Sequence, residues 1–415
     1  MIEYNTFTLN NGLRVAHSCD PQTAMVAVNL LYNTGARDER PNMTGIAHLF
    51  EHLMFGGSAN VEDYSAEIEA AGGYDNAWTS NDFTNFYEVL PAQNVETAFW
   101  LESDRMLSPR LDERTLAIQR QVVVEEFKQQ CLNRPYGDLG HYLRKMLYGD
   151  SHPYGWPVIG KEPSHVEAIT AEDARQWFFD HYGPDNAVLA VTGNISEEKV
   201  RELAERWFGD IESRHIAPRK LPKPAFPAED IVREVSGDVP QTAVTIAYPM
   251  AAYGEKDYFV ADTITDILSA GRSSRFYRKL LMGCGGLMSE VDASIIGSEH
   301  EGFLMLNAKL NDNSDEAVER VRRLMTEEAL RLAEPGEVSA YELERCMNRF
   351  ESTFNFSNMG YQARAANLAL ALYHNEDINA SVARQRQTTV DDIARVARCM
   401  FAETPCATLI YRPNN

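Results

Sequence analysis

The sequence has few of the features that place a protein in a membrane or on nucleic acid. No apolar run approaches the roughly 18 residues that cross a bilayer. The start, MIEYNTFTLNNGLRVA, lacks the basic and then apolar segments of a signal peptide. Basic residues are scarce, with 39 lysines and arginines against 61 aspartates and glutamates, a net charge of -22 that repels phosphate backbones and anionic membranes. We expect no nucleic-acid or membrane partner and a cytoplasmic location, or a periplasmic one if a leader has been removed.

Cysteines are few and follow no recognisable pattern. They lie far apart, without CxxC spacing, at Cys19, Cys131, Cys284, Cys346, Cys399 and Cys406. Neither a disulfide framework nor a cysteine-bound zinc is indicated. The chain also lacks the GxSxG segment of a serine hydrolase. A cysteine or serine hydrolase is therefore disfavoured.

The length and one proline-rich segment divide the chain in two. A chain of 415 residues with 44% hydrophobic residues has enough apolar side chains for two cores. The prolines that indicate an extended connector near the midpoint are Pro218, Pro222, Pro224 and Pro227. We predict a first domain at 1–215, a linker at 216–230 and a second domain at 231–415.

A repeated run suggests that the two halves are related. QTAMVAVNLLY begins at Gln22 and QTAVTIAYPM begins at Gln241, 219 positions later. In each half this strand-like run is followed by a turn and then by a run of helical period. The alternative is a chance similarity of two short apolar strands. With strands and longer helices in both halves, the expected fold class is α+β: two homologous domains, each a mixed, mostly antiparallel sheet with helices packed on one face.

A buried helix is predicted in the segment GIAHLFEHLMFGG, residues 45 to 57. Its apolar side chains recur with helical spacing and would form one stripe: Ile46, Leu49, Phe50 and Leu53. Thr44 directly precedes this run and is the predicted N-cap. The helix is therefore expected to be anchored in a core.

Two histidines and a glutamate interrupt this apolar helix. His48 and His52 are four residues apart, so they project from one face about one turn apart, as two ligands of one ion must. Glu51 lies beside them, close enough to contact a water at the metal. The order HxxEH is a zinc-hydrolase signature, and ten histidines in 415 residues predict on the order of a few hundredths of such a match by chance. The alternative is a partly exposed polar helix edge without a metal.

A catalytic zinc site needs a third protein ligand and one open position. The run AIQRQVVVEEFKQQ offers Glu125 and Glu126 on a segment that is compatible with a helix. The spacing alone does not choose between these two carboxylates.

The sequence resembles the pitrilysin/insulinase family of inverted-motif zinc metallopeptidases. The segments that carry the resemblance follow in the family's order: TGIAHLFEHLMFGGS, DNAWTSNDFTNFYEVLP, VVVEEFKQ, HPYGWPVIG and GRSSRFY. They span nearly the whole chain and are more specific in its first half. The length resembles the half-length branch that includes the mitochondrial processing peptidase beta subunit and its bacterial relatives.

The resemblance implies a zinc-dependent endopeptidase that binds one Zn2+ per chain, in its first domain. It makes His48, His52 and Glu126 the metal ligands and Glu51 the base that activates water. Glu126 is chosen over Glu125 because RQVVVEE matches a family pattern in which the second glutamate of the pair binds the metal.

The resemblance also implies how substrate is bound. DNAWTS corresponds to an edge strand beside the zinc, where an extended peptide adds by backbone hydrogen bonds with Asn76 and Ala77 next to the scissile bond. Family enzymes enclose peptides or unfolded segments in a chamber of four domains, of which this chain would supply two. We therefore expect the catalytic subunit of a dimer.

Three positions depart from the family's pattern. Gln119 stands seven residues before Glu126, where the family usually has a glutamate, so it keeps hydrogen bonding near the metal but not the charge. Leu281 and Met288 stand where active members or their partner chains carry an arginine and a tyrosine that hold substrate. The expected partner is a related chain with that pair, in a heterodimer, or otherwise a second copy of this chain. The alternative function is a non-catalytic structural or assembly subunit of a related complex.

Overall fold

The computed structural model describes residues 1–217 and 219–414, so Pro218 of the expected linker lies outside the described residues. Contacts divide the chain into two compact units. Unit 1 is made of Met1–Phe127, Pro157–Leu221 and Thr353–Ser381. Unit 2 is made of Lys128–Trp156, Pro222–Ser352 and Val382–Asn415. The boundary between Leu221 and Pro222 falls inside the proline-rich segment, and the division at 216–230 stays a prediction.

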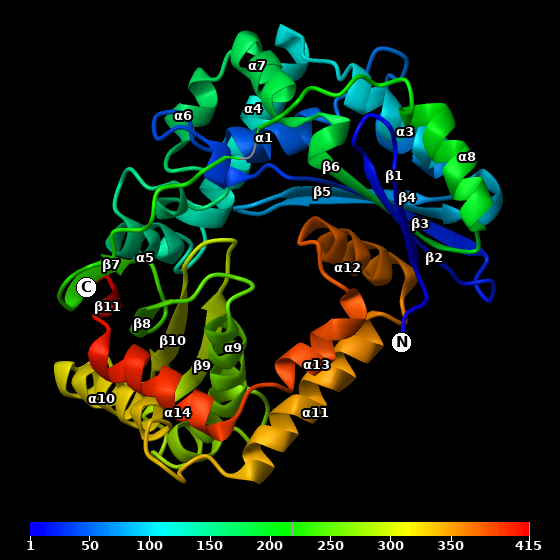
Figure 1. Cartoon of the computed structure of the whole chain (residues 1–415). Helices are drawn as coiled ribbons and strands as arrows, with labels where there is room; N and C mark the ends of the chain where they lie inside the picture. Colours follow the sequence, from blue (N-terminus) through cyan, green and yellow to red (C-terminus); the bar gives the residue numbers. More distant parts are fainter. Residues whose placement is uncertain (218, 415) are drawn as a thin grey trace. The chain divides into compact units, whose positions relative to one another are not determined.

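Each unit is built on one sheet (Figure 1). The strands of unit 1 are β1 (Asn5–Thr8), β2 (Arg14–Cys19), β3 (Met25–Tyr32), β4 (Tyr74–Thr79), β5 (Thr84–Pro91) and β6 (Ala187–Gly193), in the spatial order β1-β2-β6-β3-β5-β4. Those of unit 2 are β7 (Ile231–Gly237), β8 (Ala243–Met250), β9 (Met288–Ile296), β10 (Gly302–Leu310) and β11 (Ala407–Pro413), in the order β7-β11-β8-β10-β9. Each sheet combines parallel and antiparallel strand pairs, so both sheets are mixed.

The two sheets have the same topology, apart from the additional β1. β2 runs parallel to β6, and β7 runs parallel to β11, whereas the other neighbouring strands of the described chain are antiparallel. The repeated QTA runs enter β3 and β8, and these strands occupy the same place in their sheets. A shared topology around a shared sequence supports duplication over chance similarity.

Helices cover both sheets. Those of unit 1 alone are α1 (Ile46–Leu53), α2 (Tyr64–Ala70), α3 (Glu96–Leu107), α4 (Glu113–Phe127), α6 (Pro163–Ala168), α7 (Ala171–His181), α8 (Glu197–Phe208) and α12 (Tyr361–Tyr373). Those of unit 2 alone are α5 (Leu139–Tyr148), α9 (Lys256–Ser269), α10 (Asp315–Arg331), α14 (Val390–Arg398) and the π-helical turns η3 (Lys128–Leu132), η6 (Phe276–Leu281) and η8 (Cys399–Glu403). α11 (Ala340–Ser357) and α13 (Ser381–Gln385) contribute residues to both units. In the described ranges, no helix is long and apolar enough to cross a bilayer.

The expected α+β fold is confirmed, and the structure adds a helix on the second face of each sheet. In unit 1 the main core lies between the sheet and helices such as α1, α3 and α8, whereas α12 packs on the alternate strand residues through Leu368 and Ala369 (Figure 1). In unit 2 the main core includes Ile410, whereas the adjacent Tyr411 faces Tyr142 of α5. These second-face helices come from distant parts of the chain.

The helix α1 begins differently from the sequence prediction. The predicted apolar stripe is fully buried, but Thr44 does not cap the helix. Gly45 is the N-cap, in a left-handed conformation with φ of 88°. The backbone N–H groups of Gly45 and Ala47 both donate to Oε1 of the buried Glu39, at 3.0 Å each. The Thr44 hydroxyl instead accepts from the N–H of Lys161 at 2.8 Å. The N-cap prediction was wrong because a carboxylate six residues upstream takes that role.

Replacing Glu39 with alanine is expected to destabilise unit 1. The change leaves two buried N–H donors of α1 without an acceptor, which should cost about 2 to 4 kcal/mol of the free energy of unfolding. Urea unfolding followed by circular dichroism measures it, with the exposed Glu62→Ala as the control. A Glu39→Ala midpoint equal to that of Glu62→Ala would contradict this role.

Candidate metal centre

The helix α1 presents its titratable residues on the side away from its apolar stripe. The stripe packs into the core of unit 1, so the helix has little freedom to rotate. His48, Glu51 and His52 are half-buried. The two imidazole rings lie edge to face, with centroids 4.8 Å apart. The i, i+4 spacing of the sequence thus produces a pair of imidazoles at one site.

Helix α4 brings a carboxylate to this pair. Oε2 of Glu126 lies 3.7 Å from Nε2 of His48 and 3.4 Å from Nε2 of His52. One possible ligand atom from each of the three residues lies within 4.8 Å of the other two. Glu125, the other sequence candidate, is exposed, whereas Glu126 is half-buried. The structure therefore groups Glu126 with the two histidines.

The donor atoms have a spacing that fits a zinc ion. Ligands at about 2.1 Å from a tetrahedral zinc are about 3.4 Å from one another. The two histidine-to-glutamate distances of 3.4 and 3.7 Å are close to this value. Two imidazoles and one carboxylate are also the donor set of catalytic zinc sites in which a fourth position stays open. Among all the residues that the structure describes, this is the one such group of three.

The protonation states also suit a metal. Burial and the adjacent His52 lower the pKa of His48 to about 4, so its imidazole is neutral at pH 7. The hydrogen bond from His52 lowers the pKa of Glu126, which is therefore ionised. Metal ligation needs these deprotonated forms. Nδ1 of His48 is buried and has no hydrogen-bond partner within the described chain.

Glu51 has a separate role in the geometry. It is not one of the three grouped donors, and its Oε2 accepts a hydrogen bond from the hydroxyl of Thr79 on β4. Burial raises the pKa of Glu51, and the hydrogen bond from Thr79 opposes this effect. A carboxylate with a raised pKa both accepts and returns a proton more readily near neutral pH. Thr79 thus holds Oε2 of Glu51, and this hydrogen bond does not engage Oε1.

Strand β4 forms an open sheet edge beside α1. It pairs with β5, and on its other side it has no partner among the described strands. The N–H of Ala77 donates to the side-chain Oδ1 of Asn76 at 2.8 Å instead of to β5. In an antiparallel pair the N–H and C=O of one residue point the same way, so both groups of Ala77 face the open edge. Thr79 lies two residues further along, on the face of Ala77.

Gln119 lies two helical turns before Glu126 on α4. Its side chain is half-buried and makes no hydrogen bond to any residue that the structure describes. A seven-residue separation places it on the same helix face as Glu126. The expected hydrogen bonding near the metal stays a prediction.

Two residues at the site were not predicted from the sequence. Glu39 fixes the start of α1, and Thr79 lies beside Glu51. For Thr79, only the alternation of DNAWTS could have indicated this position.

Comparison with known proteins identifies the family. Residues 14–138 match the family described as "Insulinase (Peptidase family M16)" and residues 168–350 match the "Peptidase M16 inactive domain". The zinc protease PqqE of Helicobacter pylori is 27% identical over 99% of this chain and 93% of its own length. The probable mitochondrial-processing peptidase subunit beta of Schizosaccharomyces pombe is 32% identical over 62% of this chain and 56% of its own length.

Solved structures agree with this result. The crystal structure of a protease from Helicobacter pylori matches 99% of this chain and 100% of its own with a TM-score of 0.88, at 27% identity. The peptidase M16 inactive domain from Pseudomonas fluorescens also has a TM-score of 0.88, but at 18% identity it supports the fold alone. Both M16 matches lie in this one chain, and relatives named zinc proteases align with it from end to end. The chain therefore belongs to the M16 (insulinase) peptidase family, in its half-length branch.

Proposed function

We propose that this chain is a zinc-dependent endopeptidase that hydrolyses peptides or unfolded segments. The observation that carries the proposal is the convergence of His48, His52 and Glu126, with Glu51 beside them but outside the donor group. Zinc held there would lower the pKa of a water and polarise a substrate carbonyl. The alternative, a non-catalytic structural or assembly subunit, gives no reason to retain the three donors together with Glu51.

The chain's own residues would handle the proton. Oε1 of Glu51 takes a proton from the attacking water and passes it to the nitrogen of the leaving amine. Thr79 keeps the carboxylate in position through Oε2. The site is half-buried, and this limits the competing water around the carboxylate.

The open edge of β4 is the proposed docking strand for substrate. An extended peptide added there would bond to the N–H and C=O groups of Ala77 and would displace the side chain of Asn76 from that N–H. Backbone pairing of this kind is indifferent to substrate sequence. It also requires an extended segment, so folded domains are poor substrates.

Replacing Ala77 with proline is expected to raise the KM for peptides about 3- to 10-fold, because it removes one backbone donor from the docking edge. Proline is tolerated where the N–H of an edge strand faces outward, so the fold should persist. Steady-state cleavage of a quenched-fluorescent peptide measures the effect, with Ala77→Ser as the control. An unchanged KM in a folded Ala77→Pro variant would exclude docking at this position.

We also propose that full activity needs a second chain. The positions where the family carries its substrate-holding arginine and tyrosine are Leu281, which packs against the core of unit 2, and Met288, which is 2% exposed. Neither side chain donates a hydrogen bond. A related chain with that pair would complete the site in a heterodimer, and a homodimer would have to hold substrate differently.

The experiment that tests the proposed function measures zinc content and cleavage of a quenched-fluorescent peptide mixture by the pure chain. Zinc with cleavage would show a self-sufficient peptidase. Zinc without cleavage would favour the missing partner, and adding a related chain that carries the arginine and tyrosine should then restore activity. A pure chain that binds no zinc would overturn the proposal.

A further inference from the structure

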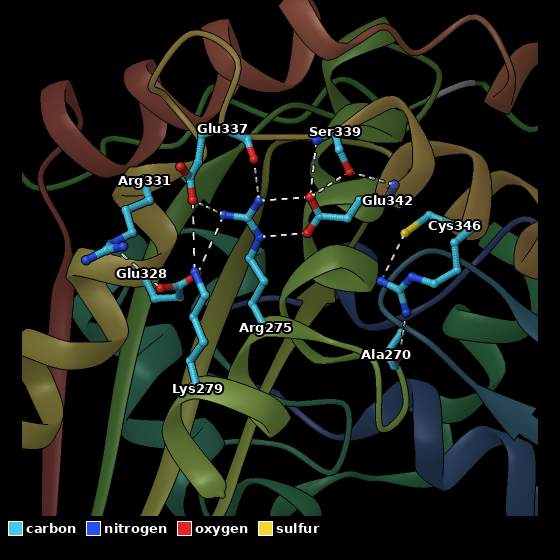
Figure 2. Close-up of polar contacts among 10 residues, drawn as sticks. Ala270, Arg275, Lys279, Glu328, Arg331, Glu337, Ser339, Glu342 and Cys346 are labelled. Carbon is cyan, nitrogen blue, oxygen red and sulfur yellow. Dashed lines mark hydrogen bonds and ion pairs between the residues drawn. The ribbon is translucent and has the colours of Figure 1, made fainter. Parts of the chain in front are cut away.

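Unit 2 contains a cavity of 630 Å³, well away in sequence from the residues of the metal centre. One wall is the segment from Ser273 to Lys279, which includes the start of η6. The other wall runs from Glu337 to Arg345 and includes the start of α11. Figure 2 shows Arg275 and Lys279 of the first wall turned toward Glu337 and Glu342 of the second.

The cavity is basic in an acidic protein. The lining cations are Arg275, Arg278, Lys279 and Arg345, against the two carboxylates of Glu337 and Glu342. The whole chain has a net charge of -22. Four basic side chains around one cavity are therefore unusual in a chain that has more acidic than basic residues. Like charges so gathered repel one another unless something neutralises them.

Part of this charge is neutralised within the fold. Nε and Nη2 of Arg275 bind the two oxygens of Glu342 at 3.0 and 3.1 Å, and its Nη1 binds Oε1 of Glu337 at 3.1 Å (Figure 2). Nζ of Lys279 lies 2.6 Å from Oε1 of the buried Glu328. The nearby carboxylates are thus paired with Arg275 and Lys279.

Two guanidinium groups remain without a carboxylate. Arg278 is exposed, and no ion pair joins it to any residue in the described ranges. Arg345 donates from Nη1 to the carbonyl oxygen of Ala270 at 3.2 Å, and its Nη2 lies 3.7 Å from Sγ of Cys346. No acidic oxygen of the described chain lies within 4.0 Å of either group. Each wall thus carries one arginine that makes no ion pair in the described ranges, and the charge of Arg345 still acts on the carboxylate of Asp266.

We propose that this cavity binds a small anion that carries phosphate groups, of the size of pyrophosphate. Arginine recognises phosphate through paired, charge-assisted hydrogen bonds, and Arg278 and Arg345 are the two lining arginines that make no ion pair in the described ranges. The hydroxyls of Ser273 and Tyr341 add neutral donors to the lining. The volume lies within the usual range of small-molecule sites. The ligand would tie η6 to the start of α11 and so stabilise unit 2.

The test is calorimetric titration of the full chain with inorganic pyrophosphate at low ionic strength, with citrate as a polycarboxylate of similar charge. We expect binding of pyrophosphate that is tighter than that of citrate and that weakens with added salt. Arg278→Gln and Arg345→Gln should each lower the affinity about tenfold, because each removes a charged hydrogen-bond donor. The control is Arg320→Gln, an exposed arginine of α10 for which we expect no change.

Adenosine diphosphate, as a second phosphate source, separates free pyrophosphate from the phosphates of a nucleotide. Binding of either that falls in both arginine variants supports the site. If both variants bind as tightly as the original protein, the anion binds elsewhere, such as at a metal in unit 1, and the proposal is wrong. The proposal is also wrong if millimolar pyrophosphate does not bind or if citrate binds more tightly. If Arg345→Gln does not fold, Arg345→Lys takes its place in the test. This variant keeps the positive charge but should still bind pyrophosphate more weakly.

Discussion

Glu51→Gln is expected to abolish peptide cleavage while the chain keeps its zinc. Glutamine has nearly the same shape and can still accept a hydrogen bond from the hydroxyl of Thr79, but it cannot take a proton from water. General acid and base catalysis contributes typically 10²- to 10⁴-fold to a rate, and Glu51 would serve both steps. We therefore expect kcat to fall at least about a hundredfold, with little change in KM.

Zinc content separates this result from a structural defect. Glu51 lies outside the three grouped donors, so metal analysis should give the same zinc per chain in Glu51→Gln as in the original protein. The activity measurement uses the chain in whichever form proves active, alone or with its partner. Near-full activity in the glutamine variant would exclude Glu51 as the base, and loss of zinc would assign it to the metal ligands instead.

Glu126→Gln is expected to lose the metal as well as the activity. The change replaces an anionic ligand by a neutral amide, and the two histidines alone leave the site one ligand short. Changes in the surroundings of a metal site typically cost 10- to 100-fold in affinity, so a lost ligand should cost at least about a hundredfold. Competition with a chelator of known affinity measures the loss.

The adjacent residue offers a matched control for this experiment. Glu125→Gln makes the same chemical change one position earlier on α4, at an exposed side chain. We expect it to keep zinc and activity. If Glu125→Gln lost zinc while Glu126→Gln kept it, the third ligand would be Glu125, and the choice made from the family pattern would be wrong.

The local parts of the site were predictable because they follow from helical geometry. A spacing of four places His48 and His52 on one face of any α-helix, and the apolar stripe of Leu49 and Phe50 fixes which face meets the core. The repeated QTA run likewise predicts equivalent strands, because short β-branched apolar runs are typical of buried strands. These features depend on residues that are close together in the chain.

The other parts depend on contacts that spacing does not encode. The cap on α1 comes from Glu39, because a loop turns that carboxylate back toward the N–H of Gly45. A local rule favours Thr44, the nearer residue. Thr79 reaches Glu51 only because β4 lies beside α1, and α12 reaches the sheet of unit 1 from the far end of the sequence. Periodicity identifies such elements but does not say which of them meet.

The late arrival of α12 has a consequence for biosynthesis. All the strands of the first sheet have been synthesised once Gly193 is made, yet the helix that covers its second face begins only at Tyr361. During that interval an apolar surface that includes Leu31 and Ala190 stays bare on the nascent chain. Such intermediates aggregate readily. The emerging chain is therefore a natural client for a chaperone, and a stop codon before Tyr361 should release an insoluble fragment even though it contains His48, His52 and Glu126.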